Sequence, residues 1–258
     1  YDILAQAEGG LMSVTGWPGG APTRVGCSIG DISAGLFNAV GILAALHQRN
    51  LTGEGQKVDV AMLDCQVAIL ENALARYQVD GVSPEPLGNR HPTISPFQAY
   101  QARDNWMVIA IGNDALWQKF CEAAGRNDLA GDGRFTTNQD RTRNLDALNE
   151  ILEPLMQQRT VGEWSGIFTG AGIPHSRINN IEQVLQNRQV QARAMIATVD
   201  DPVAGTVRVA GNPIKMSSME DSTVRPPVPE LGEDTDHVLE SIGYSPEQIA
   251  TLRAEGVV

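Results

Sequence analysis

The stretch VGCSIGDISAGLFNAVGILAAL, residues 25–46, carries the strongest structural signal in this sequence. Its apolar residues recur every three or four positions, which predicts a helix over residues 32–49. One acid, Asp31, follows Gly30 and stands directly before the apolar run. Aspartate is a favoured N-cap, because its carboxylate accepts hydrogen bonds from free backbone amides. A carboxylate kept ionised by the helix dipole is also a competent nucleophile toward an activated carbonyl, so both roles are open at Asp31.

The composition is that of an ordinary soluble globular protein. Of the 258 residues, 42% are hydrophobic and 19% are charged, and the length suits one large domain or two modest ones. The formal net charge of −12 argues against nucleic acid and against an anionic membrane surface as partners. No run approaches the ~18 apolar residues of a membrane helix, so no membrane partner is expected.

Cysteine and histidine spacing predicts neither disulfides nor a metal site. Cys27, Cys65 and Cys121 are widely spaced and form no CxxC pair, which predicts reduced thiols and a cytoplasmic location. The four histidines show neither HExxH nor i, i+4 spacing. The phosphate-binding and nucleophile motifs GxGxxG, GxxxxGK[ST] and GxSxG are absent.

The rest of the chain mixes expected strands and helices, which predicts an α/β or α+β fold. Thr160 and Glu163 have capping-box spacing, and Asp114 is expected to cap a helix. The loop at residues 79–96 is rich in proline and glycine. Strands are expected at residues 57–62, 106–111, 173–178 and 206–209, and helices at residues 3–12, 63–77, 113–124, 144–158, 160–170, 181–187, 237–242 and 246–255.

Six blocks of the sequence carry a longer pattern. They are YDILAQAEGGLMSVTG, GAPTRVGCSIGDISAG, LTGEGQKVDVAMLD, SPFQAYQARDNWMVIAIGND, GIPHSRINNIEQVL and PPVPELGEDTDHVLESIGYSPEQIATLRAEGVV. Together, and in this order, they resemble the family III CoA-transferases, the group that contains the formyl-CoA and carnitine CoA-transferases. The resemblance spans nearly the whole chain.

The resemblance implies that Asp31, in the pattern G-D-x-x-x-G, is the catalytic aspartate. Its carboxylate would attack the thioester carbonyl of an acyl-CoA and form an aspartyl–acyl anhydride. CoA would then form an aspartyl-CoA thioester, which the acceptor carboxylate attacks in turn. Acyl-CoA and a carboxylic acid are therefore the expected substrates. No permanently bound cofactor and no metal are expected.

The resemblance also implies a substrate and CoA pocket near Asp31. Tyr1 matches a tyrosine that lines the acyl pocket of formyl-CoA transferases, and Met62 matches a residue packed near the thiol arm of CoA. Gln6 lies about one helical turn beyond Tyr1, and either faces the same cleft or lies on the helix surface.

The family places a flexible loop over the aspartate at Gly88–Ser95. Formyl-CoA enzymes have a glycine run there, whereas this chain reads GNRHPTIS, which resembles the subgroup that uses dicarboxylates such as succinate or glutarate. Arg90 and His91 are expected either to bind a distal carboxylate or to shape the loop, with a role as plain exposed loop residues as the alternative.

The fold implied by the resemblance is α/β, with a Rossmann-like large domain split in sequence and a smaller α+β domain. The family forms interlocked ring dimers, so a homodimer is expected. The chain is also expected to lack the family's N-terminal part, which supplies most contacts to CoA. The expected parts are residues 1–62 of the large CoA-binding domain with the nucleophile, a linker helix at 63–87, the small domain at 88–185, and a return segment at 186–258 that completes the large domain.

Two alternatives to a transferase stay open. The α-methylacyl-CoA racemase branch needs a histidine and an aspartate as an acid–base pair, and its histidine falls at the position of Tyr1, before Asp2. Tyrosine, with a free pKa of about 10, is a poor base at neutral pH, which favours the transferase. The second alternative is a non-catalytic dimerisation or binding fragment, in which Asp31 only caps a helix.

Overall fold

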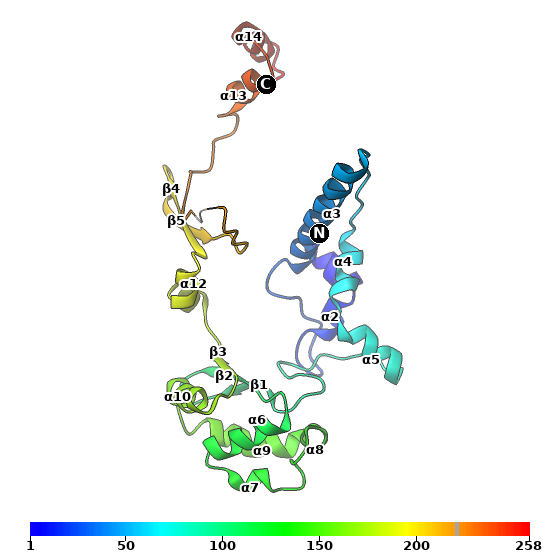
Figure 1. The fold of residues 1–258 in the computed structure, drawn as a ribbon, viewed down its shortest axis with the longest axis vertical. Coiled ribbons are helices and arrows are strands. Elements are labelled where there is room, and N and C mark those ends of the chain that lie inside the picture. Colours follow the sequence, from blue (N-terminus) through cyan, green and yellow to red (C-terminus); the bar gives the residue numbers. More distant parts are fainter. Residues whose placement is uncertain (220–221) are drawn as a thin grey trace. The chain divides into compact units, whose positions relative to one another are not determined.

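The structure, a computed structural model, describes residues 1–219 and 222–258 and divides into two compact units, Tyr1–Ile178 and Asn179–Val258 (Figure 1). Unit 1 contains α1 (Asp2–Glu8), α2 (Leu11–Val14), α3 (Ile29–Thr52), α4 (Met62–Ile69), α5 (Asn72–Asp80), β1 (Phe97–Gln101), β2 (Trp106–Ala110), α6 (Asp114–Ala123), α7 (Asn127–Ala130), α8 (Asn138–Arg143), α9 (Leu145–Met156), α10 (Val161–Ala171) and β3 (His175–Arg177). Unit 2 contains α11 (Ile181–Leu185), α12 (Arg188–Ala192), β4 (Ile196–Asp201), β5 (Gly205–Ala210), β6 (Val224–Arg225), α13 (Thr235–Ser241) and α14 (Pro246–Ala254).

The hydrophobic core of unit 1 lies around the antiparallel sheet β1-β2-β3. Strand β2 pairs with both neighbours, and its Met107 and Ile109 are fully buried. Helix α9 presents Leu148 and Leu152 to this core, at the four-residue spacing of one helix face. Trp117, Phe120, Trp164 and Phe168 from α6 and α10 complete it.

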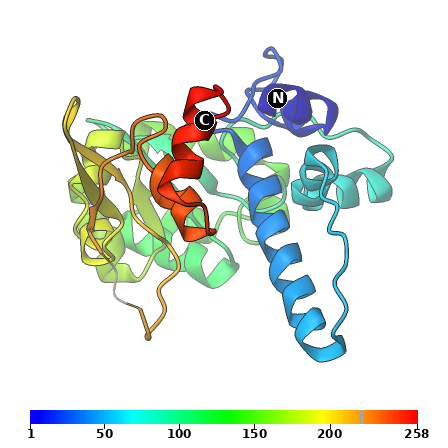
Figure 2. The same cartoon turned by 90° about the horizontal axis from the view of Figure 1, so that it is seen from above.

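The predicted helix at 32–49 is confirmed and is longer than expected, because α3 starts three residues earlier and ends at the left-handed Gly53. The segment at residues 54–61 then runs back along α3 (Figure 2). The strand predicted at 57–62 is wrong: the segment is extended but pairs with no strand in the described residues.

Helix α3 also corrects the expectation that no run approaches the length of a membrane span. It is the one helix of the described residues that is long and apolar enough to cross a membrane. A single helix of this kind is weak support for a membrane segment, because core helices of soluble proteins have the same length and composition.

Two other predicted helices differ from expectation. The single helix expected at residues 63–77 is divided into α4 and α5. Glu71 takes a positive φ of 52°, which a continuous helix cannot contain. Asp114 does not cap α6. The extended residue Asn113 does, since its side chain accepts a hydrogen bond from the Leu116 amide at 2.9 Å. The capping box of Thr160 and Glu163 at α10 is confirmed.

Unit 2 contains a second sheet, β5-β4-β6. Strands β4 and β5 form an antiparallel hairpin, and β6 adds parallel to β4. The described residues therefore have a mixed α/β fold. Their two sheets contain one parallel pairing, so the Rossmann-like domain, its split in sequence and the four-part division stay predictions.

Candidate functional site

Asp31 lies in the first turn of α3 and is exposed. The N-cap of α3 is Ser28, so of the two roles left open for Asp31, that of N-cap is wrong. Within residues 1–219 and 222–258, no group donates a hydrogen bond to the Asp31 carboxylate. The carboxylate thus stands at the positive end of a 24-residue helix with all of its acceptor capacity free.

A different carboxylate serves the amides at this helix end. The Gly30 amide donates to Asp2 Oδ1 at 2.8 Å, and the Gln6 side-chain amide donates to Asp2 Oδ2 at 2.8 Å. The Val25 amide donates to Gln6 Oε1 at 2.9 Å. Asp2 and Gln6 of α1 therefore hold both the start of α3 and the chain that leads into it.

Gln6 is fully buried, so it neither lies on the helix surface nor faces an open cleft. Both ends of its side-chain amide are used, one by Asp2 and one by Val25. A buried amide needs partners at both ends, and Gln6 has them in Asp2 and Val25, so its role in the substrate pocket stays a prediction.

Glycine at position 30 permits this contact. A Cβ atom on Gly30 would lie 2.9 Å from Asp2 Oδ1, closer than side-chain carbons approach. One turn further on, Ser33 donates to the Gly30 carbonyl at 3.2 Å and accepts a hydrogen bond from the buried Gln66 of α4 at 3.1 Å. Helices α1, α3 and α4 thus meet around the turn that carries Asp31.

Tyr1 and Met62 begin two of the helices at this junction. Tyr1 is the N-cap of α1 and is 95% exposed, so the described residues do not enclose its ring. Met62 is the half-buried first residue of α4, one turn before Gln66. Neither residue makes a hydrogen bond with Asp31 in the part of the chain that the structure describes.

Gly88 opens the loop 88–95 and is docked on the loop that precedes α3. Its amide donates to the Gly16 carbonyl at 2.8 Å. Its φ is +68°, and a Cβ atom there would lie 2.7 Å from the ring of Trp17. Glycine is therefore required by the backbone angle and by the indole ring beneath it.

His91 shapes this loop. Its Nδ1 accepts hydrogen bonds from the amides of Thr93 and Ile94, both at 3.1 Å. Its own amide donates to the Phe97 carbonyl at 2.9 Å, and its ring packs 5.3 Å from that of Phe97. Of the two roles expected for His91, the structure supports the shaping of the loop.

Arg90 lines a cavity of about 470 Å³. A second cation, Arg143, lines the same cavity, as do the carboxylates of Asp146 and Glu153. The other lining residues are Trp17, Pro18, Leu87, Asn89, Gln98, Ala99, Trp106, Thr142, Leu145 and Asn149. Asp31 is not among them, so the structure does not bring Arg90 and Asp31 to one cavity.

A buried tyrosine supports one wall of this cavity. The Tyr100 hydroxyl donates to Asn149 Oδ1 at 2.8 Å. Burial raises the pKa of that hydroxyl well above its usual range, and the nearby Glu153 carboxylate adds to the rise. Tyr100 therefore remains a neutral donor that fixes the orientation of the Asn149 amide.

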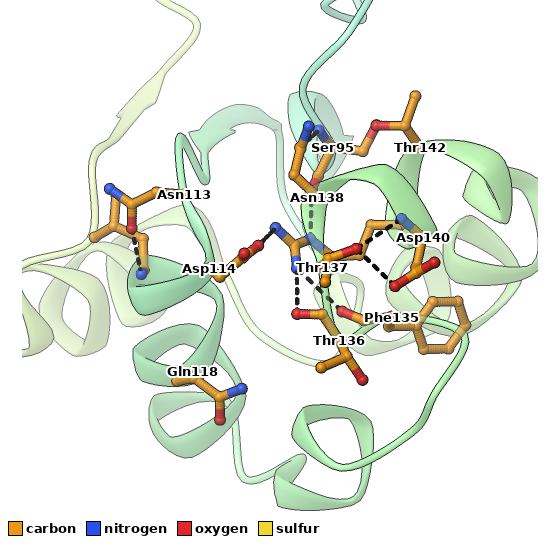
Figure 3. Close-up of polar contacts among 12 residues, drawn as sticks. Ser95, Asn113, Asp114, Gln118, Phe135, Thr136, Thr137, Asn138, Asp140 and Thr142 are labelled. Carbon is orange, nitrogen blue, oxygen red and sulfur yellow. Dashed lines mark hydrogen bonds and ion pairs between the residues drawn. The ribbon is translucent and has the colours of Figure 1, made fainter.

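The far end of the loop is fixed by a residue that sequence reasoning missed. Arg141 is fully buried and donates to the carbonyls of Ser95 at 2.7 Å and Phe135 at 3.0 Å, and to Asp114 Oδ1 at 2.7 Å. Figure 3 labels these three partners, which come from separate segments of the chain. Its guanidinium also lies 5.2 Å from the Trp117 ring centre. An arginine in a polar helix such as NQDRTR carries no sequence signal of burial, so only the structure reveals this anchor.

The described residues contain no group of three or more His, Cys, Asp or Glu side chains arranged to hold a metal ion. Cys65 and Cys121 are buried and Cys27 is exposed, and all three are free thiols. The chemistry available around Asp31 is thus that of a free carboxylate at a helix start.

Comparison with known proteins gives a consistent result. The model of "CoA-transferase family III" matches residues 1–235. An acetyl-CoA:oxalate CoA-transferase from Acetobacter aceti is 38% identical over 234 residues, which cover 90% of this chain and 59% of that protein. The succinyl-CoA:glutarate CoA-transferase of Homo sapiens is 32% identical over 259 residues, covering 100% of this chain and 59% of the relative.

The fold has a match among solved structures as well. The crystal structure of a CAIB/BAIF family protein from Brucella suis superposes with a TM-score of 0.77 at 34% identity, over 93% of this chain and 62% of that one. The chain thus spans about three fifths of the length of the relatives it matches.

Proposed function

The chain belongs to CoA-transferase family III, and from that membership we propose that the protein transfers CoA from an acyl-CoA thioester to a carboxylic acid, with Asp31 as the nucleophile. The observation that carries the proposal is the free, exposed carboxylate of Asp31 at the start of α3. A carboxylate that only capped the helix would be bonded to the helix amides, and here Asp2 has that role.

The proposed reaction uses only the Asp31 carboxylate and the two substrates. One carboxylate oxygen attacks the thioester carbonyl and the C–S bond breaks. CoA leaves as a thiolate, and a mixed anhydride of Asp31 and the acyl group remains. The thiolate then attacks the Asp31 carbonyl, releases the donor acid and forms an aspartyl-CoA thioester. The acceptor carboxylate displaces CoA to form a second anhydride. The thiolate finally attacks the acceptor carbonyl, which yields the new acyl-CoA and free Asp31.

The start of α3 supports two requirements of this chemistry. The positive end of a helix dipole stabilises negative charge in the first turn, and Asp31 lies in the first turn of α3. The same dipole opposes loss of the negative charge when the anhydride forms, so it favours the return of the free carboxylate in the last step. Turnover needs both, because the nucleophile must be regenerated.

We further propose a dicarboxylic acid as the acceptor. The two relatives described above are named for oxalate and for glutarate, which are both dicarboxylic acids. Guanidinium groups bind carboxylates with paired hydrogen bonds, but the cavity that Arg90 lines does not include Asp31, so Arg90 as the ligand of a distal carboxylate stays a prediction. A homodimer and a cytoplasmic location belong to the same proposal.

The test is covalent trapping in the full-length protein that contains this chain. Incubation with acetyl-CoA or succinyl-CoA should give a mass adduct on the peptide of Asp31, and hydroxylamine should convert that aspartate to its hydroxamate. Asp31→Asn should abolish the adduct and lower turnover by about a thousandfold or more. Asp64→Asn is the matched control, since Asp64 is an exposed acid in the first turn of α4. A full-length protein with no adduct and no CoA exchange would contradict the proposal. Exchange of the α-proton in deuterated water without transfer would identify a racemase.

A further inference from the structure

We propose that Asp2 is a positioning residue for Asp31: its carboxylate accepts a hydrogen bond from the amide of Gly30, immediately before Asp31, and so fixes the turn of α3 that carries the Asp31 carboxylate. This inference rests on the proposed function, because it concerns how the same nucleophile is held. It assigns a role to a second acid that touches neither CoA nor the acyl group.

The start of α3 has the sequence of a capping box that is not formed. Ser28 and Asp31 stand at the N-cap and third helical positions, the S-x-x-D pattern in which the two side chains bond each other's amides. The Ser28 side chain makes no capping bond. The carboxylate of the third residue, Asp31, accepts no hydrogen bond in the described part of the chain.

Three other helices of this chain form the capping box. In α10, α11 and α14, the third residue bonds back to the N-cap amide, at 2.7 Å for Glu163, 3.0 Å for Gln183 and 2.8 Å for Gln248. At α3 this bond is absent, and the carboxylate that accepts from an amide at the start of α3 is Asp2 of α1.

The Asp2 carboxylate lies at the start of α3. Its side chain is 10% exposed, and Oδ1 lies 2.8 Å from the Gly30 amide. Oδ2 accepts from the buried Gln6 and lies 3.6 Å from the Arg24 guanidinium. Both oxygens are therefore fixed, and the cation partly balances the charge that Asp2 brings near Asp31.

Gly30 is the second element of the arrangement. Its Cβ-free backbone lets Asp2 approach to hydrogen-bond distance, and any side chain there would press on Asp2 Oδ1. The residue immediately before the nucleophile therefore serves the cap of the helix. Gly30→Ala should disturb the hydrogen bond between the Gly30 amide and Asp2, which Asp2→Ala removes.

The experiment measures the single-turnover rate of Asp31 adduct formation with acyl-CoA in the full-length protein, per unit of folded protein. Asp2→Ala should lower that rate about tenfold or more, since a small displacement of a reacting group costs this much, while KM for acyl-CoA stays within about twofold. Gly30→Ala should act in the same direction. Asp2→Asn, which keeps an acceptor for the Gly30 amide but turns a donor toward Gln6, should fall between wild type and Asp2→Ala.

The outcomes separate this inference from the proposed function. Asp64→Asn should leave the rate unchanged, because that acid makes no hydrogen bond in the described residues and lies outside the contact. If Asp2→Ala and Gly30→Ala lower only the melting temperature or the reactive fraction, and the rate per reactive site equals that of wild type, Asp2 is merely structural and the inference fails. If wild type itself forms no adduct, the proposed function fails, and the inference fails with it. If Asp2→Ala does not fold, Asp2→Asn and Gly30→Ala decide.

Discussion

Two regions of unit 1 are stabilised in opposite ways. The sheet region, residues 97–177, buries large apolar side chains such as Trp117, Phe120 and Phe168, each with 0% exposure. The helical region, residues 1–80, buries no side chain larger than glutamine. Its contacts are hydrogen bonds and close approaches at glycine, and α3 leaves Leu36 and Leu43 64% and 66% exposed.

The difference shows which contacts fix the geometry of the candidate site and which contacts stabilise the fold. Apolar burial is non-directional and gives the sheet region a core that tolerates small shifts. Hydrogen bonds with fixed geometry, such as those of Asp2, hold the turn of Asp31 in one place. The sheet region should thus be sensitive to loss of volume, and the helical region to added volume at its glycines.

The largest predicted effect is the loss of volume in the core of the sheet region. Phe168→Ala removes a fully buried ring that contacts Trp164 and Phe120, and should lower the free energy of unfolding by about 3–5 kcal/mol. Urea denaturation followed by tryptophan fluorescence measures it. Leu36→Ala in α3 should change stability by less than about 0.5 kcal/mol. A cost above about 1 kcal/mol at Leu36 would show that the assembled protein buries this face of α3.

The next effect concerns the polar anchor inside the sheet region. Arg141→Met keeps most of the side-chain volume but leaves the Ser95 and Phe135 carbonyls without their donor, so the free energy of unfolding should fall by about 3 kcal/mol. Hydrogen exchange at residues 93–95 should rise with it. Arg134→Met is the control, because that arginine forms an exposed pair with Asp132, which contributes little. An unchanged exchange rate at 93–95 would refute the anchoring of the loop.

Added volume in the helical region gives the third prediction. A Cβ atom on Gly9 would overlap the Cβ of Gln66 and approach the Ala5 carbonyl to 2.8 Å, so Gly9→Ala should cost about 1–3 kcal/mol and separate α1 from α4. Thermal unfolding measures the loss. Gly26→Ala, where nothing lies within 4 Å of the new atom, should be neutral. Equal effects at both glycines would remove the contrast between the two regions.

How far the sequence predicts each region depends on how local its contacts are. The helix at 32–49 and the capping box of Thr160 and Glu163 were predictable, because spacing within a few residues determines both. Strand β1 was not, since FQAYQ lacks strict alternation and follows a proline. Its existence depends on pairing with β2.

The candidate site shows the same division. The pattern G-D-x-x-x-G marks Asp31 as the candidate nucleophile, which stays a prediction, and the family predicted from the six sequence blocks is confirmed. The Asp2 cap joins residues 28 positions apart, and the Arg141 bond to Ser95 joins residues 46 apart. No periodicity or motif encodes such pairs. The prediction for Gln6 therefore missed that its amide supports Asp2.

The smallest predicted effect tests the capping box that α3 lacks and α10 has. Hydrogen bonds from the Thr160 amide and hydroxyl lower the pKa of the Glu163 carboxyl below its ordinary 4.5. A lowered folded pKa stabilises the fold above the unfolded pKa, and this contribution is lost as pH falls through the folded pKa. Glu163→Gln keeps an acceptor for the Thr160 amide but does not titrate, so wild type should lose stability relative to Glu163→Gln between about pH 5 and pH 3. Paired urea midpoints at pH 6 and pH 3 measure the difference. The comparison cancels the titration of every other group. A constant difference in urea midpoint would mean that the charge of Glu163 adds no stability to the capping box of α10. The box of α10 would then be no guide to the stability that α3 loses because Asp31 forms no such box.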